Sequence, residues 1–248
     1  MRLKIIYTLI SCLSFQAVFP QVYIELGPMQ NNRDAFSSVT VYGSDGLKKN
    51  VPYDEIGGSA FWKQEWSKAY LYDQRDTFLG IYNARFNFVT NELHYLDRAG
   101  AERAAIPGSL NKIVFVKTED STAIITVFRS NIIEVTRRSV CKKCFIQELN
   151  QGDVKLLKLT YRVLKIKDSL FGTIKKYYFY DETEYFLQYR DKYERIKKLN
   201  KDNLFSFLPN VSAYKNWISA QKLQFKKEED FIFFINYYNA SRRDDKPQ

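Results

Sequence analysis

The most compact group of reactive residues in the chain is the cysteine pair of Cys141-Lys142-Lys143-Cys144. A straight strand would point these two side chains to opposite faces, so their sulfurs meet only where the backbone turns or begins a helix. We expect a structural disulfide, the default for paired cysteines in an exported chain. Thiol–disulfide chemistry, with nearby lysines lowering the thiol pKa, remains an alternative, as do free thiols or a metal. Zinc is disfavoured because two thiolates need two further ligands.

The single histidine of the chain, His94, limits the enzyme classes that the sequence can encode. Two-histidine metal motifs such as HExxH are excluded, and a Ser-His-Asp triad would have to use His94. The sequence contains no GxSxG elbow, Walker loop, Rossmann fingerprint or EF-hand loop. We therefore interpret His94 as a polar residue on a sheet face, and we expect no cofactor. A hydrolase remains an alternative, because paired catalytic carboxylates meet in space rather than at a fixed spacing.

Aromatic and basic side chains are concentrated between Ile174 and Tyr193. Rings at strand spacing usually face a core, which is the first interpretation of this segment. The second is a binding platform, in which exposed rings stack on sugars while cations pair with anionic groups. The candidate platform residues are Lys175, Lys176, Tyr178, Tyr180, Tyr185, Tyr189 and Arg190.

The first 21 residues have the pattern of a secretory signal peptide. Arg2 and Lys4 precede an apolar run from Ile5 to Phe19, which is shorter than the roughly 20 residues that span a bilayer. We expect cleavage between Ala17 and Gln21 and a mature protein in the periplasm or outside the cell. No later stretch of the sequence is long and uncharged enough to span a membrane.

A second processing route is open at Cys12. The run Leu9-Ile10-Ser11-Cys12 is similar to a bacterial lipobox, in which the cysteine carries the lipid. The residues after Cys12 are apolar where a polar tether is usual, so lipid attachment to the envelope is the alternative to a free exported protein.

Composition favours a folded, basic, β-rich protein. Hydrophobic residues make up 45% of the 248 residues, which is enough for a substantial core, and aromatic residues make up 16%, which favours strands. The formal net charge is +10, which favours polyanionic partners, but the basic residues are spread along the chain, so a solvated basic surface is the first interpretation. In an exported protein we expect the partner to be a protein or an acidic glycan, and we expect no nucleic acid; the oligomeric state is open.

The strand pattern predicts an antiparallel β-domain over residues 22–198. Alternation is clearest from Phe78 to Val89, and turns at Asp73–Asp76 and Asp97–Gly100 indicate a β-meander or a barrel-like sheet. We expect the aromatic segment to form a hairpin around Asp181-Glu182-Thr183. The fold class is therefore α+β, mainly β.

From Leu199 the apolar period becomes helical, which predicts a helical appendage over residues 199–240 and a disordered tail over residues 241–248. Asn200 is the expected cap of a first helix that ends at Leu208-Pro209, and a second helix is expected from Val211 to Leu223. The third begins at Glu228-Glu229-Asp230, where acidic residues favour a helix start. Its expected core stripe comprises Phe231, Phe234, Ile235 and Tyr238.

Two parts of the chain resemble uncharacterised exported proteins of Bacteroidetes-type bacteria. They comprise Phe61 to Tyr72 with Ala84–Asn87 and Thr90–Asp97, and the closing run from Leu204 to Asn239. The resemblance implies a secreted or envelope protein and carries over no catalytic residue. We expect a non-enzymatic binding or interaction protein, with a thiol–disulfide oxidoreductase using Cys141 and Cys144, or a hydrolase, as alternatives.

Overall fold

The computed structural model describes residues 37–42, 47–119, 122–130, 132, 144–168, 175–196 and 198–243. The expected signal peptide, Cys12 and Cys141 lie outside these residues. The chain divides into two compact units, residues 1–52 and residues 53–248. In the first, β1 (Ser38–Tyr42) and β2 (Lys48–Pro52) form an antiparallel pair in which Val39 lies opposite Val51.

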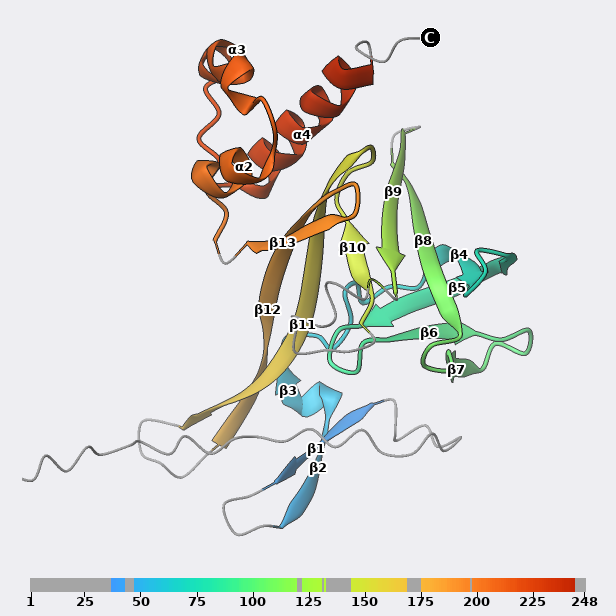
Figure 1. Cartoon of the computed structure of the whole chain (residues 1–248). Helices are drawn as coiled ribbons and strands as arrows, with labels where there is room; N and C mark the ends of the chain where they lie inside the picture. The colour runs from blue at the N-terminus through green and yellow to red at the C-terminus, as the bar shows by residue number, and fades with distance from the viewer. Residues whose placement is uncertain are drawn as a thin grey trace, which may run out of the picture. The chain divides into compact units, whose positions relative to one another are not determined.

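The second unit contains one large sheet and a group of C-terminal helices (Figure 1). The sequence prediction of an α+β, mainly β fold is confirmed. Along the sheet the described strands follow the order β13-β12-β11-β10-β9-β8-β4-β5-β6-β7, and the short β3 pairs parallel to β12. The strands are β3 (Ile56–Gly57), β4 (Ser67–Asp73), β5 (Phe78–Asn87), β6 (Glu92–Leu96), β7 (Glu102–Ala104), β8 (Leu110–Glu119), β9 (Thr122–Arg129), β10 (Ile146–Glu148), β11 (Val154–Asp168), β12 (Lys175–Tyr189) and β13 (Lys192–Ile196).

The strands from β4 to β7 form the predicted meander, but β8 departs from chain order. Instead of pairing with β7, β8 returns to pair with β4, so that Ala69 lies opposite Phe115. The reason is packing: apolar residues of β4, β5, β8 and β9 share one buried cluster, which includes Phe86 stacked on Phe128 at 5.0 Å. Burial of such rings contributes most of the free energy that holds these strands together.

The longest strands, β11 and β12, form a single antiparallel pair over their whole length. The hairpin expected around Asp181-Glu182-Thr183 is wrong, because these residues continue β12 and lie opposite Arg162, Tyr161 and Thr160. Their polar groups are satisfied across the strands: Arg162 Nε is 2.6 Å from Asp181 Oδ1, and Tyr161 donates to Glu182. A polar run that resembles a turn is thus held in a strand by its partners.

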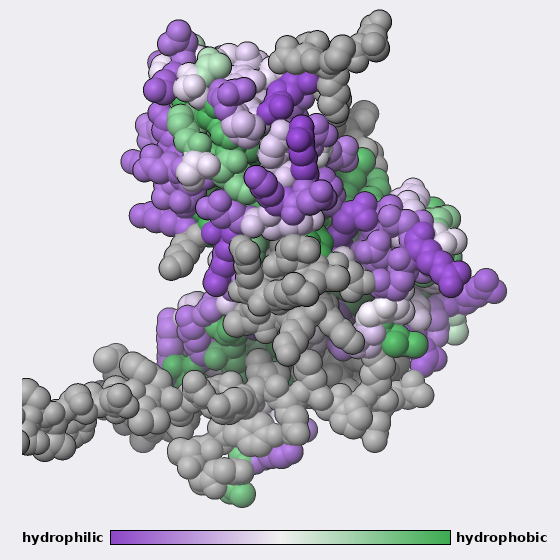
Figure 2. All heavy atoms as spheres, in the orientation of Figure 1, coloured by the Kyte–Doolittle hydropathy of each residue, from purple (hydrophilic) through white to green (hydrophobic). Residues whose placement is uncertain are grey.

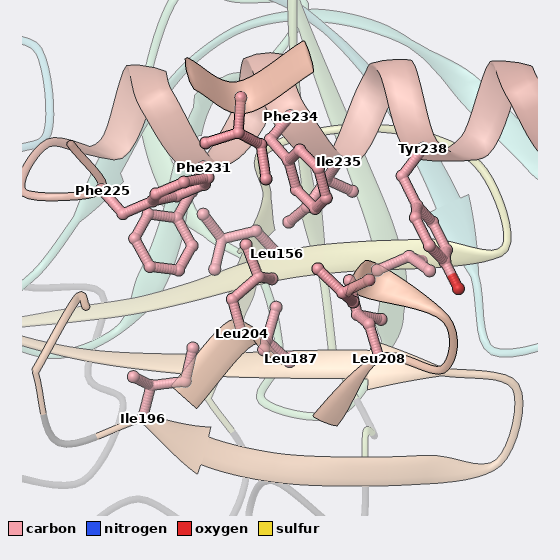
Figure 3. Close-up of a cluster of buried hydrophobic side chains, with 13 residues drawn as sticks. Leu156, Leu187, Ile196, Leu204, Leu208, Phe225, Phe231, Phe234, Ile235 and Tyr238 are labelled. Atoms are coloured by element: carbon pink, nitrogen blue, oxygen red, sulfur yellow. The ribbon is translucent and has the colours of Figure 1, made fainter. Parts of the chain in front are cut away.

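The helices cover one face of the β11–β12 pair and close a second core (Figure 3). Leu156 and Leu187 from the strands meet Phe234 and Ile235 of the last helix, while Leu204 packs from the side. The predicted core stripe of Phe231, Phe234, Ile235 and Tyr238 is confirmed, since all four are almost completely buried. The helical elements are η2 (Tyr53–Glu55), α2 (Lys201–Phe207), η3 (Val211–Tyr214), α3 (Lys215–Ala220) and α4 (Glu228–Arg243).

Local capping explains where the helices begin. The side chain of Asn200 accepts a hydrogen bond from the backbone of Asn203 at 2.8 Å, as the sequence predicted for the first helix. α4 ends at Arg243, so three residues of the expected tail are helical. Of the helices that the structure describes, none has the length and hydropathy needed to cross a membrane.

Candidate functional site

The candidate binding surface lies on one face of the β11–β12 pair, at the end that includes Lys167 and Lys176. Successive residues of a strand alternate between faces, so Lys176, Tyr178 and Tyr180 share a face. The register adds Lys167, directly opposite Lys176, and Lys165, directly opposite Tyr178. The three lysines are exposed and the two tyrosines are half-buried. We call these five residues the lysine–tyrosine face.

Lysine ammonium groups lie over the tyrosine rings of this face. Lys165 Nζ is 5.1 Å from the ring centroid of Tyr180, and Lys167 Nζ is 5.1 Å from that of Tyr178 and 5.5 Å from that of Tyr180. The two ring centroids are 6.4 Å apart. Attraction between a cation and the negative face of a ring holds each ammonium beside an aromatic surface. The face therefore presents positive charge and flat apolar area together.

The backbone below Tyr178 fixes the position of its ring. Strand β3 pairs parallel with β12, which places Gly57 beside Tyr178. A Cβ atom at position 57 would collide with the ring of Tyr178, so glycine is the residue that permits this close approach. On the opposite face, Phe179 packs edge-on against Tyr53 with ring centroids 5.6 Å apart. β12 is thus anchored on both of its faces at this point.

The electrostatics of the lysine–tyrosine face are dominated by its cations. A hydrogen bond with Tyr180 is the main reason that the pKa of Lys167 is raised, so Lys167 stays protonated at neutral pH. Beside Lys165 lies Glu182, at 3.8 Å, which also accepts a hydrogen bond from Tyr161. Glu184, two residues further along β12, pairs with Arg195, so the three lysines leave this end of the face positively charged.

The remaining residues of the predicted platform are not on this face. Tyr185 and Tyr189 alternate to the other face, where they pack against the helical core. Tyr185 donates a hydrogen bond to Glu228 of α4 at 2.8 Å. The pKa of Tyr185 is raised, mainly by burial and secondly by this hydrogen bond to a carboxylate. Arg190 lies in the turn after β12, 5.2 Å from the ring of Tyr189. Lys175 begins β12, and its side chain lies outside the described part of the structure.

His94 is enclosed in an ion-pair cluster between β5, β6 and β7. Its side chain is 1% exposed, and its Nδ1 atom is 2.7 Å from Glu102 Oε1. Arg85 lies opposite His94 and donates two hydrogen bonds to the same carboxylate, at 2.7 and 2.9 Å. The guanidinium of Arg85 also lies over the rings of Phe61 and Trp66. His94 is therefore a buried residue of strand β6 within the sheet.

The charge balance of this cluster depends on Glu102. Burial acts to raise the pKa of Glu102, but the hydrogen bonds from His94 and Arg85 outweigh it and lower that pKa. The carboxylate therefore stays ionised and links three strands. Glu102 thus receives hydrogen bonds from side chains of two neighbouring strands, which is an arrangement expected of a structural ion pair.

Of the predicted cysteine pair, the structure describes Cys144. It is almost completely buried beside Ile146, Leu157 and Phe186, two residues before β10 begins. Cys141 lies outside the described residues, so the Cys141–Cys144 disulfide remains a prediction.

Sequence reasoning placed Lys176, Tyr178 and Tyr180 in a binding platform but missed Lys165 and Lys167. Both lysines lie in the alternating run that became β11, and only the register of β11 against β12 brings them to the tyrosines. Within the residues that the structure describes, no group of three or more His, Cys, Asp or Glu side chains is arranged to hold a metal ion. Comparison of the chain with protein-family models, curated proteins and solved structures finds no match.

Proposed function

We propose that the protein is an exported, non-enzymatic binding protein that holds an acidic polysaccharide on its lysine–tyrosine face. The observation that carries this proposal is the placement of Lys165 and Lys167 over the rings of Tyr178 and Tyr180 on one exposed strand face. A sugar ring carries C–H bonds that stack on the negative face of an aromatic ring. Its carboxylate or sulfate groups pair with ammonium groups at the same place.

Spacing favours a polymer over a small anion. Residues two apart in a strand lie roughly 6.6 Å apart, so Lys165 and Lys167 present charges at a regular interval along β11. A chain of acidic sugars offers anionic groups repeatedly, and several weak exposed pairs add up where one alone contributes little. Removal of residues 1–21 takes away Arg2 and Lys4, and the formal charge of 36 − 28 = +8 that remains would draw such a polyanion toward the protein.

Export is the second part of the proposal, and the sequence supports it through the charged start and short apolar run of residues 1–21. In an oxidising compartment we also propose a structural disulfide between Cys141 and Cys144. The burial of Cys144 supports a structural role, since catalytic thiols are partly exposed. A thiol count on the unfolded, unreduced mature protein should give none for this pair, and two reactive thiols would contradict it.

The binding proposal is tested with hexagalacturonate, an acidic hexasaccharide, by isothermal titration calorimetry. Replacing Lys165, Lys167 and Lys176 together by glutamine should weaken binding about tenfold or more, because the paired cations are lost. The control replaces three exposed lysines elsewhere, Lys68, Lys192 and Lys198, and makes the same change in net charge. The control should stay within about twofold of the parent protein.

Two results would contradict the proposal. If both triple variants lose affinity equally, the protein attracts polyanions only through its net charge. If the parent protein does not bind hexagalacturonate and also fails to bind a sulfated hexasaccharide, this face does not recognise an acidic glycan.

A further inference from the structure

Strand β5 has an open edge along its first half. On one side, β4 pairs with β5 from Phe78 to Ala84, whereas on the other side β6 pairs with β5 from Ala84 to Asn87. β5 and β6 lie apart toward the turn that joins β4 to β5 (Figure 1). Within the part of the chain that the structure describes, no strand pairs with residues 78–83 on the β6 side. We call residues 78–83 the open edge.

The open edge lacks the features that usually keep a strand edge from pairing. It contains no charged residue and no proline. Phe78, Leu79 and Ile81 are 51%, 48% and 53% exposed, and Figure 2 shows hydrophobic residues at the surface beside hydrophilic ones in the part of the sheet around β4 and β5. By contrast, β7 and β13, at the two ends of the described sheet, are three and five residues long and carry charged residues. An uncharged apolar edge is a template for a further strand.

Hydrogen bonds farther along β5 show which backbone groups face the open edge. The backbone groups of Phe86 and Phe88 bond to the segment before β4, at 2.8 Å in both cases, on the β4 side of β5. Successive residues of a strand direct their backbone groups to opposite edges, and the register is unbroken as far back as Gly80. Ile81 therefore turns its N–H and its C=O to the open edge, and Leu79 turns its C=O there.

A second copy of the open edge fits these groups when the two strands run antiparallel about a two-fold axis at Gly80. Leu79 of each copy then lies opposite Ile81 of the other, which pairs exposed apolar side chains. In this register the Ile81 N–H of each copy donates to the Leu79 C=O of the other. The edge is thus complementary to itself, as the interface of a two-fold dimer requires. At the axis, the two Gly80 residues bring no side chains together.

The charges beside the open edge also allow two copies to approach. The chain around the β4–β5 turn carries Asp73, Arg75 and Asp76, and the β6–β7 turn carries Asp97 and Arg98. The same register brings the first turn of one copy near the second turn of the other, so charges of both signs meet. A bilayer would instead require an excess of lysine or arginine beside the apolar residues, which these turns do not have.

We propose that two copies of the protein pair through the open edge of β5, so that their large sheets join into one. Five paired residues span roughly 16 Å, so the dimer is weak and its population depends on concentration. The proposal is independent of the lysine–tyrosine face, which lies on β11 and β12.

The test measures the oligomeric state by sedimentation equilibrium over about 1–200 μM protein. The parent should form dimers, and the double variant Leu79→Lys with Ile81→Lys should dimerise about tenfold or more weakly, because each new lysine lies opposite another. Both replaced side chains are about half exposed, so the melting temperature should stay that of the parent. The matched control, Ile106→Lys with Ile124→Lys, changes two isoleucines outside the open edge that are 69% and 44% exposed. The control should dimerise within about twofold of the parent.

An exchange of charge tests the register. Leu79→Glu with Ile81→Glu should also fail to dimerise alone, but an equimolar mixture with the lysine variant should form dimers, since each lysine then faces a glutamate. The proposal is overturned if the parent stays monomeric throughout the concentration range, if the lysine variant dimerises as the parent does, if the control loses dimers as strongly as the lysine variant, or if the mixture stays monomeric. A monomeric parent that binds a capped synthetic peptide of residues 77–83 would also overturn it, because the edge would then take a strand from another protein.

Discussion

Single polar residues link separate strands of this fold through directional hydrogen bonds and ion pairs. Arg162 is the clearest case: its side chain pairs with Asp181 and donates to the backbone carbonyls of Ser59 and Phe61, while its own N–H donates to Phe88. Through its side chain and its backbone, this one residue ties β11 to the segment before β4 and to Phe88, directly after β5. Glu102 does the same for β5, β6 and β7 through Arg85 and His94.

The role of Glu102 predicts a specific dependence of stability on pH. Its pKa is lower in the folded protein than in the unfolded chain, so its contribution is fully present above the ordinary glutamate pKa of 4.5 and is lost as the pH falls through the folded value. Glu102→Gln should therefore lower the free energy of unfolding at pH 7 and flatten its decline on acidification below about pH 4.5. Urea unfolding at a series of pH values checks this.

The control for that series is Glu65→Gln, which changes an exposed carboxylate. It should follow the parent curve throughout. If the free energy of unfolding of Glu102→Gln falls below pH 4.5 as steeply as that of the parent protein, the Arg85–Glu102–His94 cluster does not contribute the stability that its geometry indicates.

At the scale of elements, the sequence predicted most strands and all three helical regions. It was wrong about the pairing of β8, which lies beside β4, and about the hairpin expected within β12. Alternation located β5, and the cap at Asn200 located α2, because both signals are local. The supposed hairpin failed because Asp181-Glu182-Thr183 has turn-like composition, while its partners, Arg162 and Tyr161, lie about 20 residues away. Only part of the lysine–tyrosine face could be predicted, for the same reason. The tyrosines lie together in the sequence of β12, but Lys165 and Lys167 reach them through the register of β11 against β12, which no local pattern shows.

The attachment of α4 to the sheet offers a second prediction. Asn239 Oδ1 accepts from Val154 N at 2.9 Å, and its Nδ2 donates to Val154 O at 2.8 Å, so a helix side chain pairs with the start of β11 as a strand would. Asn239→Ala leaves the buried N–H of Val154 without this partner and should cost about 1–3 kcal/mol in the free energy of unfolding. Asn236→Ala, on the exposed side of α4, is the control and should change it by less than about 0.5 kcal/mol. Equal effects of the two substitutions, measured by urea unfolding, would show that Asn239 does not fix the helix.

At the scale of the molecule, the described part of the chain buries its histidine and Cys144 and exposes the three lysines of the lysine–tyrosine face. The single histidine and the described cysteine are both buried at 1% exposure. The lysine–tyrosine face combines exposed lysines with half-buried tyrosine rings. The exposed cations and rings are the part of this arrangement on which the proposed binding of an acidic polysaccharide depends.

The most direct test of the account is to map where an acidic glycan binds, by following backbone amide resonances while hexagalacturonate is added. We predict that the largest shifts fall at residues 163–167 of β11 and 176–180 of β12, with the shifts decreasing as salt screens the charges. Shifts confined to other strands or to the helices, or shifts spread evenly over exposed lysines, would contradict a binding site on the lysine–tyrosine face.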